Sequence, residues 1–284
     1  MFHSMEDMLH AAATRPVWEA VLEDDCNERG TDRTESWSRM EQLWQAMRDS
    51  AADYDPARQS SSGLVGGDGG KMEAVSTTIC GGLVQAVIAT ALKVGESNAC
   101  MGRVVAAPTA GSSGVLPAVL IPLQGGDRLT DDDMVRALYT AAGFGQVIAA
   151  RASIAGAEGG CQAEIGSASG MAAAALVQLR GGNSQQMADA CAMALQNLMG
   201  LICDPVAGLV EVPCVKRNVI GAMNALSAAE MALAGIGSPI PCDEVIDALR
   251  AVSDSMPAAL RETGAGGLAA TPTGRNIAAR LRNH

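Results

Sequence analysis

The chain has 284 residues but few aromatic side chains, few histidines and no excess of positive charge. Phe, Trp and Tyr together make up 2% of it, although 48% of its residues are hydrophobic. Small residues must therefore do much of the packing. This favours closely packed helices over a β-sandwich, which normally uses aromatic and β-branched side chains. We predict an all-α fold in which Ala and Gly bring the helices into close contact.

Two further shortages exclude classes of function. The three histidines, His3, His10 and His284, all lie near the ends of the chain, so a Ser–His–Asp or Cys–His mechanism inside the core is not expected. The formal net charge is −11, and we see no basic face of the kind that a nucleic-acid-binding protein needs. We therefore expect no nucleic-acid partner.

The sequence also lacks targeting and membrane-spanning segments. Its first ten residues contain Glu6 and Asp7 and no apolar run, so they do not resemble a signal peptide. Charged residues such as Arg151, Glu158 and Glu230 interrupt the apolar stretches before they reach the ~18–20 residues of a membrane helix. We expect a soluble, cytoplasmic protein without membrane contact. Its eight cysteines then suggest metal or redox use rather than a disulfide framework.

Composition divides the chain into three parts. Residues 1–58 carry most of the aromatic residues and are predicted to form a helical extension, with an amphipathic helix from Arg33 to Ala52. On that helix Trp37, Met40, Leu43, Trp44 and Met47 are spaced to lie on one face. Residues 59–70 are rich in Gly and Ser and are predicted to be a linker. Residues 71–284 are predicted to form the main domain.

The main domain has a helical pattern almost throughout. Thr130 precedes three aspartates and is predicted to cap a helix, and Gly181 with Gly182 is predicted to end one. The expected helices cover residues 73–94, 131–150, 168–180, 184–200, 215–235 and 243–254.

Cysteines fall into two groups according to the residues around them. Cys161, Cys203 and Cys214 lie at boundaries marked by Gly or Pro, where a thiolate can sit near exposed backbone N–H groups and bind a metal. Cys80 and Cys191 lie in apolar segments with a helical pattern and are predicted to be small core residues. The spacing of the first group matches no short zinc or ferredoxin motif, so buried structural cysteines remain an alternative for it as well.

Two segments of small residues are candidates for binding an anion. Thr109, Gly111 and Ser112 belong to a turn whose N–H groups and hydroxyls are suited to hold a carboxylate. Ser167 and Ser169 precede an Ala-rich helix and are suited to the same task at its N-terminus. An ordinary loop and an ordinary helix cap are the alternatives.

Several segments resemble the α chain of bacterial iron–sulfur L-serine dehydratases. They are Ala106 to Ser112, Gly159 to Gly170, Cys203 to Asn218, Arg261 to Gly264 and Gly267 to Arg275. The resemblance covers roughly residues 60–275. It includes three cysteines separated by 41 and then 10 residues, which is the ligand pattern of that family.

The resemblance implies an all-helical catalytic domain and a [4Fe–4S] cluster held by Cys161, Cys203 and Cys214. Three protein ligands leave one iron open, and an open iron acts as a Lewis acid on a substrate hydroxyl. The implied reaction removes water from L-serine and yields pyruvate and ammonia. Thr109, Gly111 and Ser112, and more weakly Ser167 and Ser169, are then the expected contacts of the substrate carboxylate. Lys216 is a candidate to counter thiolate or carboxylate charge, or else a solvated helix lysine.

The chain departs from the one-chain members of this family. Those carry an additional N-terminal β domain of ~150 residues, as the resemblance implies, whereas about 60 residues precede the linker here. No cysteine follows Cys242 that would cover the open iron, as one does in some one-chain relatives. We therefore expect the α subunit of a two-chain enzyme, with a β subunit as its partner. The α chains could also associate with one another. Since the core lacks histidine, the general base is expected from the β subunit or from an oxygen on the substrate or metal.

Three other functions are consistent with parts of this pattern. A lyase that uses pyridoxal phosphate would need a Schiff-base lysine, and the chain offers Lys71, Lys93 and Lys216 in no context typical of that cofactor. A related cluster-dependent L-cysteine desulfidase would share the three cysteines. A structural or regulatory subunit with an empty site is the third alternative.

Overall fold

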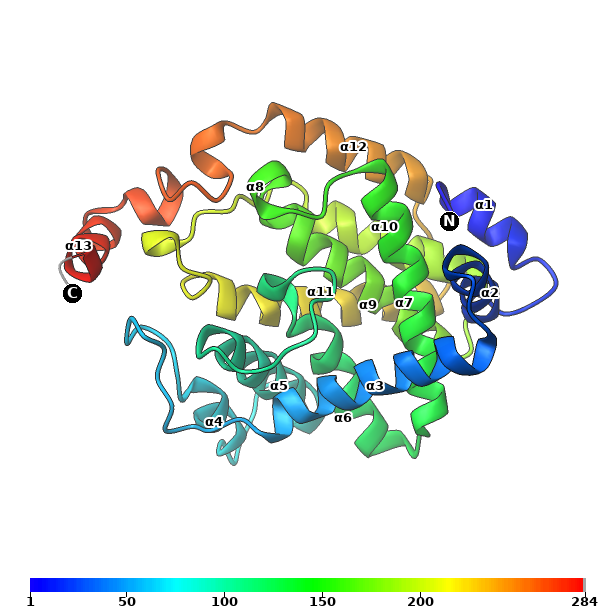
Figure 1. Ribbon diagram of the computed structural model, residues 1–284, viewed down its shortest axis with the longest axis horizontal. Coiled ribbons are helices and arrows are strands. Elements are labelled where there is room, and N and C mark those ends of the chain that lie inside the picture. The colour runs from blue at the N-terminus through cyan, green and yellow to red at the C-terminus, as the bar shows by residue number, and fades with distance from the viewer. Residues whose placement is uncertain (283–284) are drawn as a thin grey trace.

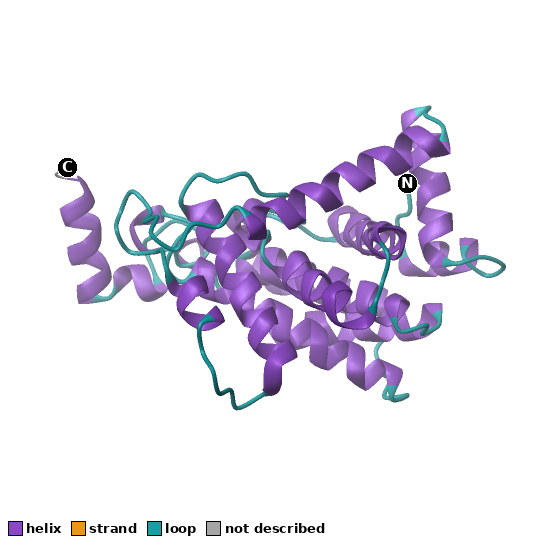
Figure 2. Ribbon diagram, turned by 90° about the horizontal axis from the view of Figure 1, so that it is seen from below, coloured by secondary structure: helices purple, strands orange, loops and turns teal. Residues whose placement is uncertain are grey.

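The computed structural model describes residues 1–282, and in that range the chain forms thirteen α-helices and no strand of a sheet (Figures 1 and 2). The prediction of an all-α fold is confirmed. The α-helices are α1 (Met5–Ala11), α2 (Val17–Arg29), α3 (Arg33–Ala52), α4 (Asp68–Glu73), α5 (Gly81–Ala99), α6 (Val115–Asp127), α7 (Asp131–Arg151), α8 (Gly156–Gly159), α9 (Ser167–Leu179), α10 (Ser184–Leu198), α11 (Cys214–Leu233), α12 (Cys242–Ser255) and α13 (Pro272–Arg282).

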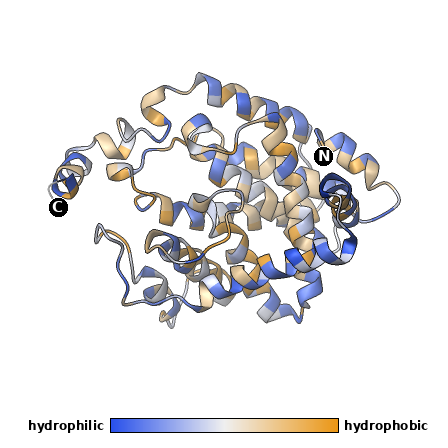
Figure 3. Cartoon of the chain, in the orientation of Figure 1, coloured by the Kyte–Doolittle hydropathy of each residue, from blue (hydrophilic) through white to orange (hydrophobic). Residues whose placement is uncertain are grey.

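Helix α9 lies at the centre of the molecule and packs against α6, α7, α10 and α11 (Figure 1). Its first eleven residues are buried, and apolar residues concentrate around it while the outer helices are mixed (Figure 3). Glycine allows the close approach, because a Cβ at Gly170 would lie 2.9 Å from Cys191 Sγ on α10. A Cβ at Gly145 on α7 would lie 2.8 Å from Met171 Sδ. Small residues therefore bring the central helices together, as the shortage of aromatic residues predicted.

The N-terminal helices share this core rather than forming one of their own. Helix α3 has the predicted bounds, and Trp44 and Met47 are buried on its inner face. Trp44 Nε1 donates a hydrogen bond of 3.1 Å to Asp131 Oδ1 at the start of α7. Leu43, which the spacing placed on the same face, is exposed. The adjacent Trp44 takes the inward position because the two side chains point about 100° apart around a helix.

The predicted helices of the main domain agree with α7, α9, α10, α11 and α12 to within two residues at each end. Thr130 caps α7 as predicted, since its hydroxyl accepts a hydrogen bond from Asp133 N. The first predicted helix, residues 73–94, is wrong at its start. Gly81 adopts a φ of +80°, which a helix interior does not allow, so α5 begins there. Cys80 is consequently exposed and not a core residue, whereas Cys191 is buried as predicted.

Residues 59–70, the predicted linker, are packed against neighbouring elements. Ser60 is buried, and its hydroxyl donates a hydrogen bond of 3.0 Å to Glu211 Oε2. Helix α4 begins at Asp68, where the buried carboxylate of Glu96 accepts hydrogen bonds from the N–H groups of Asp68 and Gly69. Within residues 1–282, no helix combines the length and the apolar character needed to cross a bilayer.

Candidate metal centre

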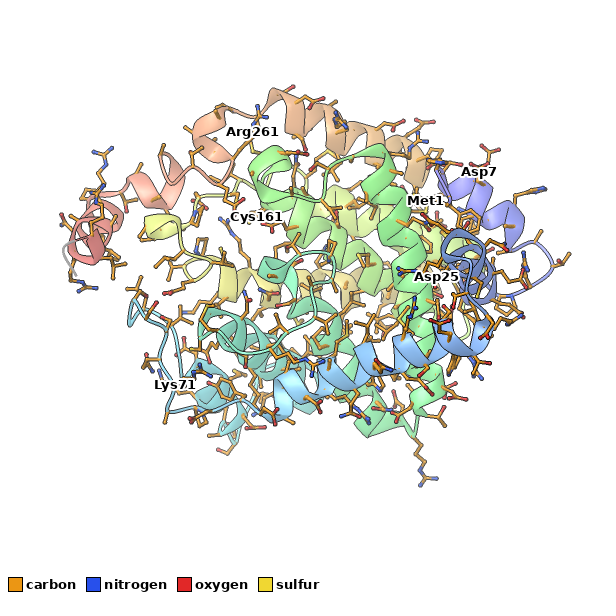
Figure 4. The ribbon with its side chains drawn as sticks, viewed as in Figure 1. Met1, Asp7, Asp25, Lys71, Cys161 and Arg261 are labelled. Atoms are coloured by element: carbon orange, nitrogen blue, oxygen red, sulfur yellow. The ribbon has the colours of Figure 1, made fainter. Side chains whose placement is uncertain are left out.

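The three candidate cysteines reach one region from three different elements. Cys161 follows α8 and directly precedes a π-helical turn at Gln162–Gly166 that continues into α9. Cys203 lies in the loop between α10 and α11, and Cys214 is the first residue of α11. All three side chains are buried, with exposed fractions of 2%, 2% and 8%. Figure 4 shows Cys161 near the middle of the molecule, with Arg261 above it and Met1 to its right. Short π-helical turns are frequent at functional sites.

Two of the sulfurs and a carboxylate form a compact group. The Sγ atoms of Cys161 and Cys203 and a carboxylate oxygen of Glu164 all lie within 4.8 Å of one another. A hydrogen bond from the Cys203 thiol lowers the pKa of Cys161, and the same bond raises the pKa of Cys203. The interaction therefore favours the thiolate at Cys161 over the thiolate at Cys203. A thiolate is the form of cysteine that binds metal.

Burial shifts the other two groups of the site toward their neutral forms. Removal from water, together with the negative charges of Cys161 and Glu164, raises the pKa of Cys214 to about 12. Burial also raises the pKa of the Glu164 carboxyl, partly opposed by a hydrogen bond from Thr109. Positive charge delivered to this site would reverse both shifts, because it favours the thiolate and the carboxylate.

Arg217 brings one positive charge to the sulfurs. It projects from the first turn of α11, and its Nη1 donates a hydrogen bond of 3.3 Å to Cys161 Sγ. The guanidinium also forms an ion pair with Asp204, at 2.8 Å between Nη2 and Oδ1. Both side chains are largely shielded from water, with exposed fractions of 14% and 3%.

Glycine leaves room around the Glu164 carboxylate. A Cβ at Gly156 would lie 2.6 Å from Glu164 Oε2 and 3.3 Å from Cys203 Sγ. A Cβ at Gly111 would lie 3.2 Å from Glu164 Oε1. Any side chain at Gly156 would therefore displace the carboxylate or the sulfur from its present position.

The turn at Thr109–Ser112 faces the same carboxylate. Thr109 Oγ1 donates a hydrogen bond of 2.7 Å to Glu164 Oε1, and Thr109 and Ser112 form a capping box. Asn218 fixes the turn against α11, because its Nδ2 donates to Gly111 O at 2.9 Å and to Cys214 O at 3.1 Å. The structure thus brings Thr109, Gly111 and Ser112 to the site that contains the cysteines.

The remaining candidate residues are placed differently. Ser169 is engaged in helix packing, since its hydroxyl donates 2.9 Å to Gly221 O on α11. Ser167 is buried, and its hydroxyl has no hydrogen-bond partner within residues 1–282. Ser167 does not cap α9, because the π-helical turn at Gln162–Gly166 runs directly into α9 and leaves no free helix start at Ser167. Lys216 is 77% exposed and lies 3.6 Å from Asp68, so its charge points away from the sulfurs.

Sequence reasoning missed the two charged residues nearest the sulfurs. Glu164 stands three positions after Cys161, a spacing that places both residues on the same side of a helical turn. An acidic residue within so apolar a stretch was the available indication. Arg217 gave no such indication beside Lys216, because the two adjacent cations differ only in which face of α11 they occupy.

Comparison with known proteins shows which family the sequence matches. The family model described as "Serine dehydratase alpha chain" matches residues 12–269. A "Probable L-serine dehydratase, alpha chain" from Bacillus subtilis is 56% identical over 221 residues, which cover 77% of this chain and 74% of the relative. An "L-serine dehydratase, alpha chain" from Peptoniphilus asaccharolyticus is 49% identical over 200 residues, which cover 70% of this chain and 68% of the relative.

A longer relative is matched over part of its length. An "L-serine dehydratase" from Mycobacterium bovis is 48% identical over 186 residues, which cover 63% of this chain but 40% of the relative. The match with the family model spans more than half of the chain and includes each of the three candidate cysteines, Glu164 and Arg217. The chain therefore belongs to the serine dehydratase alpha chain family and is a lyase.

Proposed function

We propose that this chain is the catalytic α subunit of an L-serine dehydratase and that it holds a [4Fe–4S] cluster on Cys161, Cys203 and Cys214. The observation that carries the proposal is that the sulfurs of Cys161 and Cys203 and the carboxylate of Glu164 lie within 4.8 Å of one another. Cys214 lies outside this group but is buried close enough for the charges of Cys161 and Glu164 to raise its pKa. The names of the relatives supply the substrate, L-serine, and the products that follow from its dehydration are pyruvate and ammonia.

The donor set fits an iron–sulfur cluster. Thiolates are the ligands that iron–sulfur clusters use, and a protein sets cluster properties through burial, charge and hydrogen bonds to sulfur. The site provides all of these: three buried cysteines, a hydrogen bond to Cys161 Sγ and one guanidinium that is largely shielded from water. When bound, a cluster with three protein ligands supplies an open iron, a Lewis acid that polarises the hydroxyl to be eliminated.

The side chains around the cysteines have separate tasks in the proposed reaction. Glu164 accepts the α-proton of the substrate, because its carboxylate lies within 4.8 Å of the sulfurs of Cys161 and Cys203 and is held there by Thr109. Thr109 orients this carboxylate through its hydrogen bond to Oε1. The turn containing Gly111 and Ser112 holds the substrate carboxylate, which fixes the α-carbon relative to Glu164.

The proposed assembly includes a second chain. Relatives of similar length are named alpha chains, and the longer relatives, of which this chain covers 40%, carry the name of the whole enzyme. We propose a β subunit that completes the site and is required for full turnover. Full dehydration of L-serine by the cluster-loaded chain alone would contradict this part of the proposal.

The first test is the iron and acid-labile sulfide content of the chain after anaerobic reconstitution. We expect about four irons per chain in the wild type and their loss in Cys203→Ala. Cys191→Ala is the matched control, because Cys191 is equally buried but lies between α9 and α10, away from the site. Equal iron in wild type and Cys203→Ala, or none in the wild type, would refute the assignment of the ligands.

A further inference from the structure

Arg217 links the segments that carry all three cysteines. It stands three residues after Cys214 on α11, and its Nη1 donates to Cys161 Sγ at 3.3 Å and to Ile202 O at 2.8 Å. Its Nη2 donates to Asp204 Oδ1 at 2.8 Å. The residues on both sides of Cys203 are thus bound by one guanidinium. A lysine could not make these contacts together, because its ammonium is a single point and lacks the planar fork of arginine.

Asp204 extends this link to the C-terminal part of the chain. Its second oxygen, Oδ2, accepts a hydrogen bond of 2.7 Å from Leu268 N. The neighbouring Gly267 has a φ of +57°, and a Cβ there would lie 2.3 Å from Asp204 Oδ2. Glycine at position 267 is therefore what allows the backbone to approach the carboxylate.

The same C-terminal segment is bound to Cys203 itself. Cys203 N donates 2.9 Å to Leu260 O, and Glu262 N donates 2.8 Å to Cys203 O, so Cys203 and Arg261 form an isolated β-bridge. We call residues 260–268 the C-terminal strap. Figure 4 shows Arg261 on the side of the molecule where Cys161 lies. The strap is attached at Cys203 and again, through Asp204, at Leu268.

We propose that Arg217 and Asp204 form a positioning pair that couples the properties of the cluster to the C-terminal strap. This inference rests on the proposed cluster. Hydrogen bonds to sulfur and the net charge around a cluster set its reduction potential, and a buried charge acts there with little screening from solvent. Arg217 raises the potential, since its positive charge favours the added electron. Asp204 lowers it, and the same carboxylate holds the strap over Cys203.

Because Arg217 and Asp204 carry opposite charges, substitutions can separate their effects on the reduction potential. Arg217→Gln removes the positive charge, Asp204→Asn removes the negative charge with little change of shape, and Arg217→Lys keeps the charge but loses the fork. Arg250→Gln is the matched control, because Arg250 also pairs with an aspartate but lies 55% exposed on α12. Far-UV circular dichroism establishes that each variant is folded.

The first measurement is the midpoint potential of the reconstituted, anaerobic protein. We expect Arg217→Gln to lower the equilibrium constant for one-electron reduction at least tenfold, which corresponds to about 59 mV. Asp204→Asn should shift the potential upward, and Arg217→Lys should stay closer to the wild type than Arg217→Gln does. Should Arg217→Gln retain no iron, Asp204→Asn still has to shift the potential upward relative to the wild type.

The second measurement needs no cluster. Amide hydrogen exchange of the apo chain should be at least tenfold faster at Leu268 in Arg217→Gln and Asp204→Asn, and unchanged in Arg250→Gln. If Arg217 and Asp204 acted only through their contacts, both variants would loosen the strap but would not shift the potential in opposite directions. That result would overturn the proposed effect of their charges on the cluster. Unchanged exchange at Leu268 would overturn the coupling to the strap. A wild type without iron would instead refute the proposed cluster, while the exchange measurement still tests the strap.

Discussion

Replacement of Asn218 by alanine should destabilise the protein by about 3 kcal/mol, because its amide holds the Thr109–Ser112 turn and the start of α11 together. The side chain is 1% exposed. Its Oδ1 accepts 2.9 Å from Gly114 N, and its Nδ2 donates 2.9 Å to Gly111 O and 3.1 Å to Cys214 O. Each lost bond costs about 1 kcal/mol net, and a buried N–H left without a partner costs about 1–3 kcal/mol.

The assay is thermal unfolding of the apo chain followed by circular dichroism. A loss of about 3 kcal/mol corresponds to a midpoint lowered by roughly 5 °C in a protein of this size. Asn197→Ala is the control, since Asn197 is exposed and its 2.8 Å bond to Asn224 lies at the surface. A midpoint for Asn218→Ala within 2 °C of the control, both near the wild type, would show that the buried amide is not what fixes the turn.

Three further substitutions test the site and the fold. Glu164→Gln preserves the hydrogen bond from Thr109 but removes the proposed base, so the rate of pyruvate formation should fall by about 10²–10⁴-fold while the iron content is unchanged. Gly156→Ala places a methyl group 2.6 Å from Glu164 Oε2 and should lower both the rate and the unfolding midpoint, the latter by overpacking that costs about 1–3 kcal/mol. Hydrogen bonds from Gln124 and Trp44 lower the pKa of Asp131, so Asp131→Asn should destabilise the protein at neutral pH.

Each of the three has its own control. Glu158→Gln changes an exposed glutamate on α8 and should turn over like the wild type. Gly125→Ala adds a methyl group where no atom lies within 4 Å and should not reduce stability. The carboxylate of Asp131 stabilises the fold above its usual pKa of about 4, and this contribution disappears as the pH falls through its lower folded-state pKa. The difference between Asp131→Asn and wild type must therefore shrink in acid, and a constant difference would argue against a role for the charge.

Local sequence determined most of the fold, because most helix boundaries here depend on local chemistry. Thr130 with its aspartates and Gly181 with Gly182 were recognisable as a start and a stop, and the structure confirms both. The helix predicted for residues 73–94 starts too early, because a run of apolar residues hid the positive φ at Gly81, and α5 continues five residues further, to Ala99. Helix α6 was not predicted, since Pro122 inside it argues against a helix unless the surrounding core compensates for the missing hydrogen bond.

The candidate site could be predicted in part. Neighbouring Gly and Pro singled out three cysteines, of which the structure brings Cys161 and Cys203 together beside Glu164, and the small-residue turn with Thr109 and Gly111 lies at the same place. The hydrogen bonds that give each group its charge could not be foreseen, because they join residues distant in sequence: Thr109 with Glu164, and Cys161 with Arg217.

The sequence by itself determined the helical architecture, since composition, capping residues and glycine placement act locally. The three cysteines as a ligand set came from the resemblance to a family. Tertiary structure alone decided which of two adjacent cations serves the sulfurs. Lys216 and Arg217 are neighbours in the chain, yet one is 77% exposed and the other donates to Cys161 Sγ. The physical reason is that successive residues of a helix point about 100° apart. The way α11 packs against its neighbours turns Arg217, and not Lys216, toward the sulfurs.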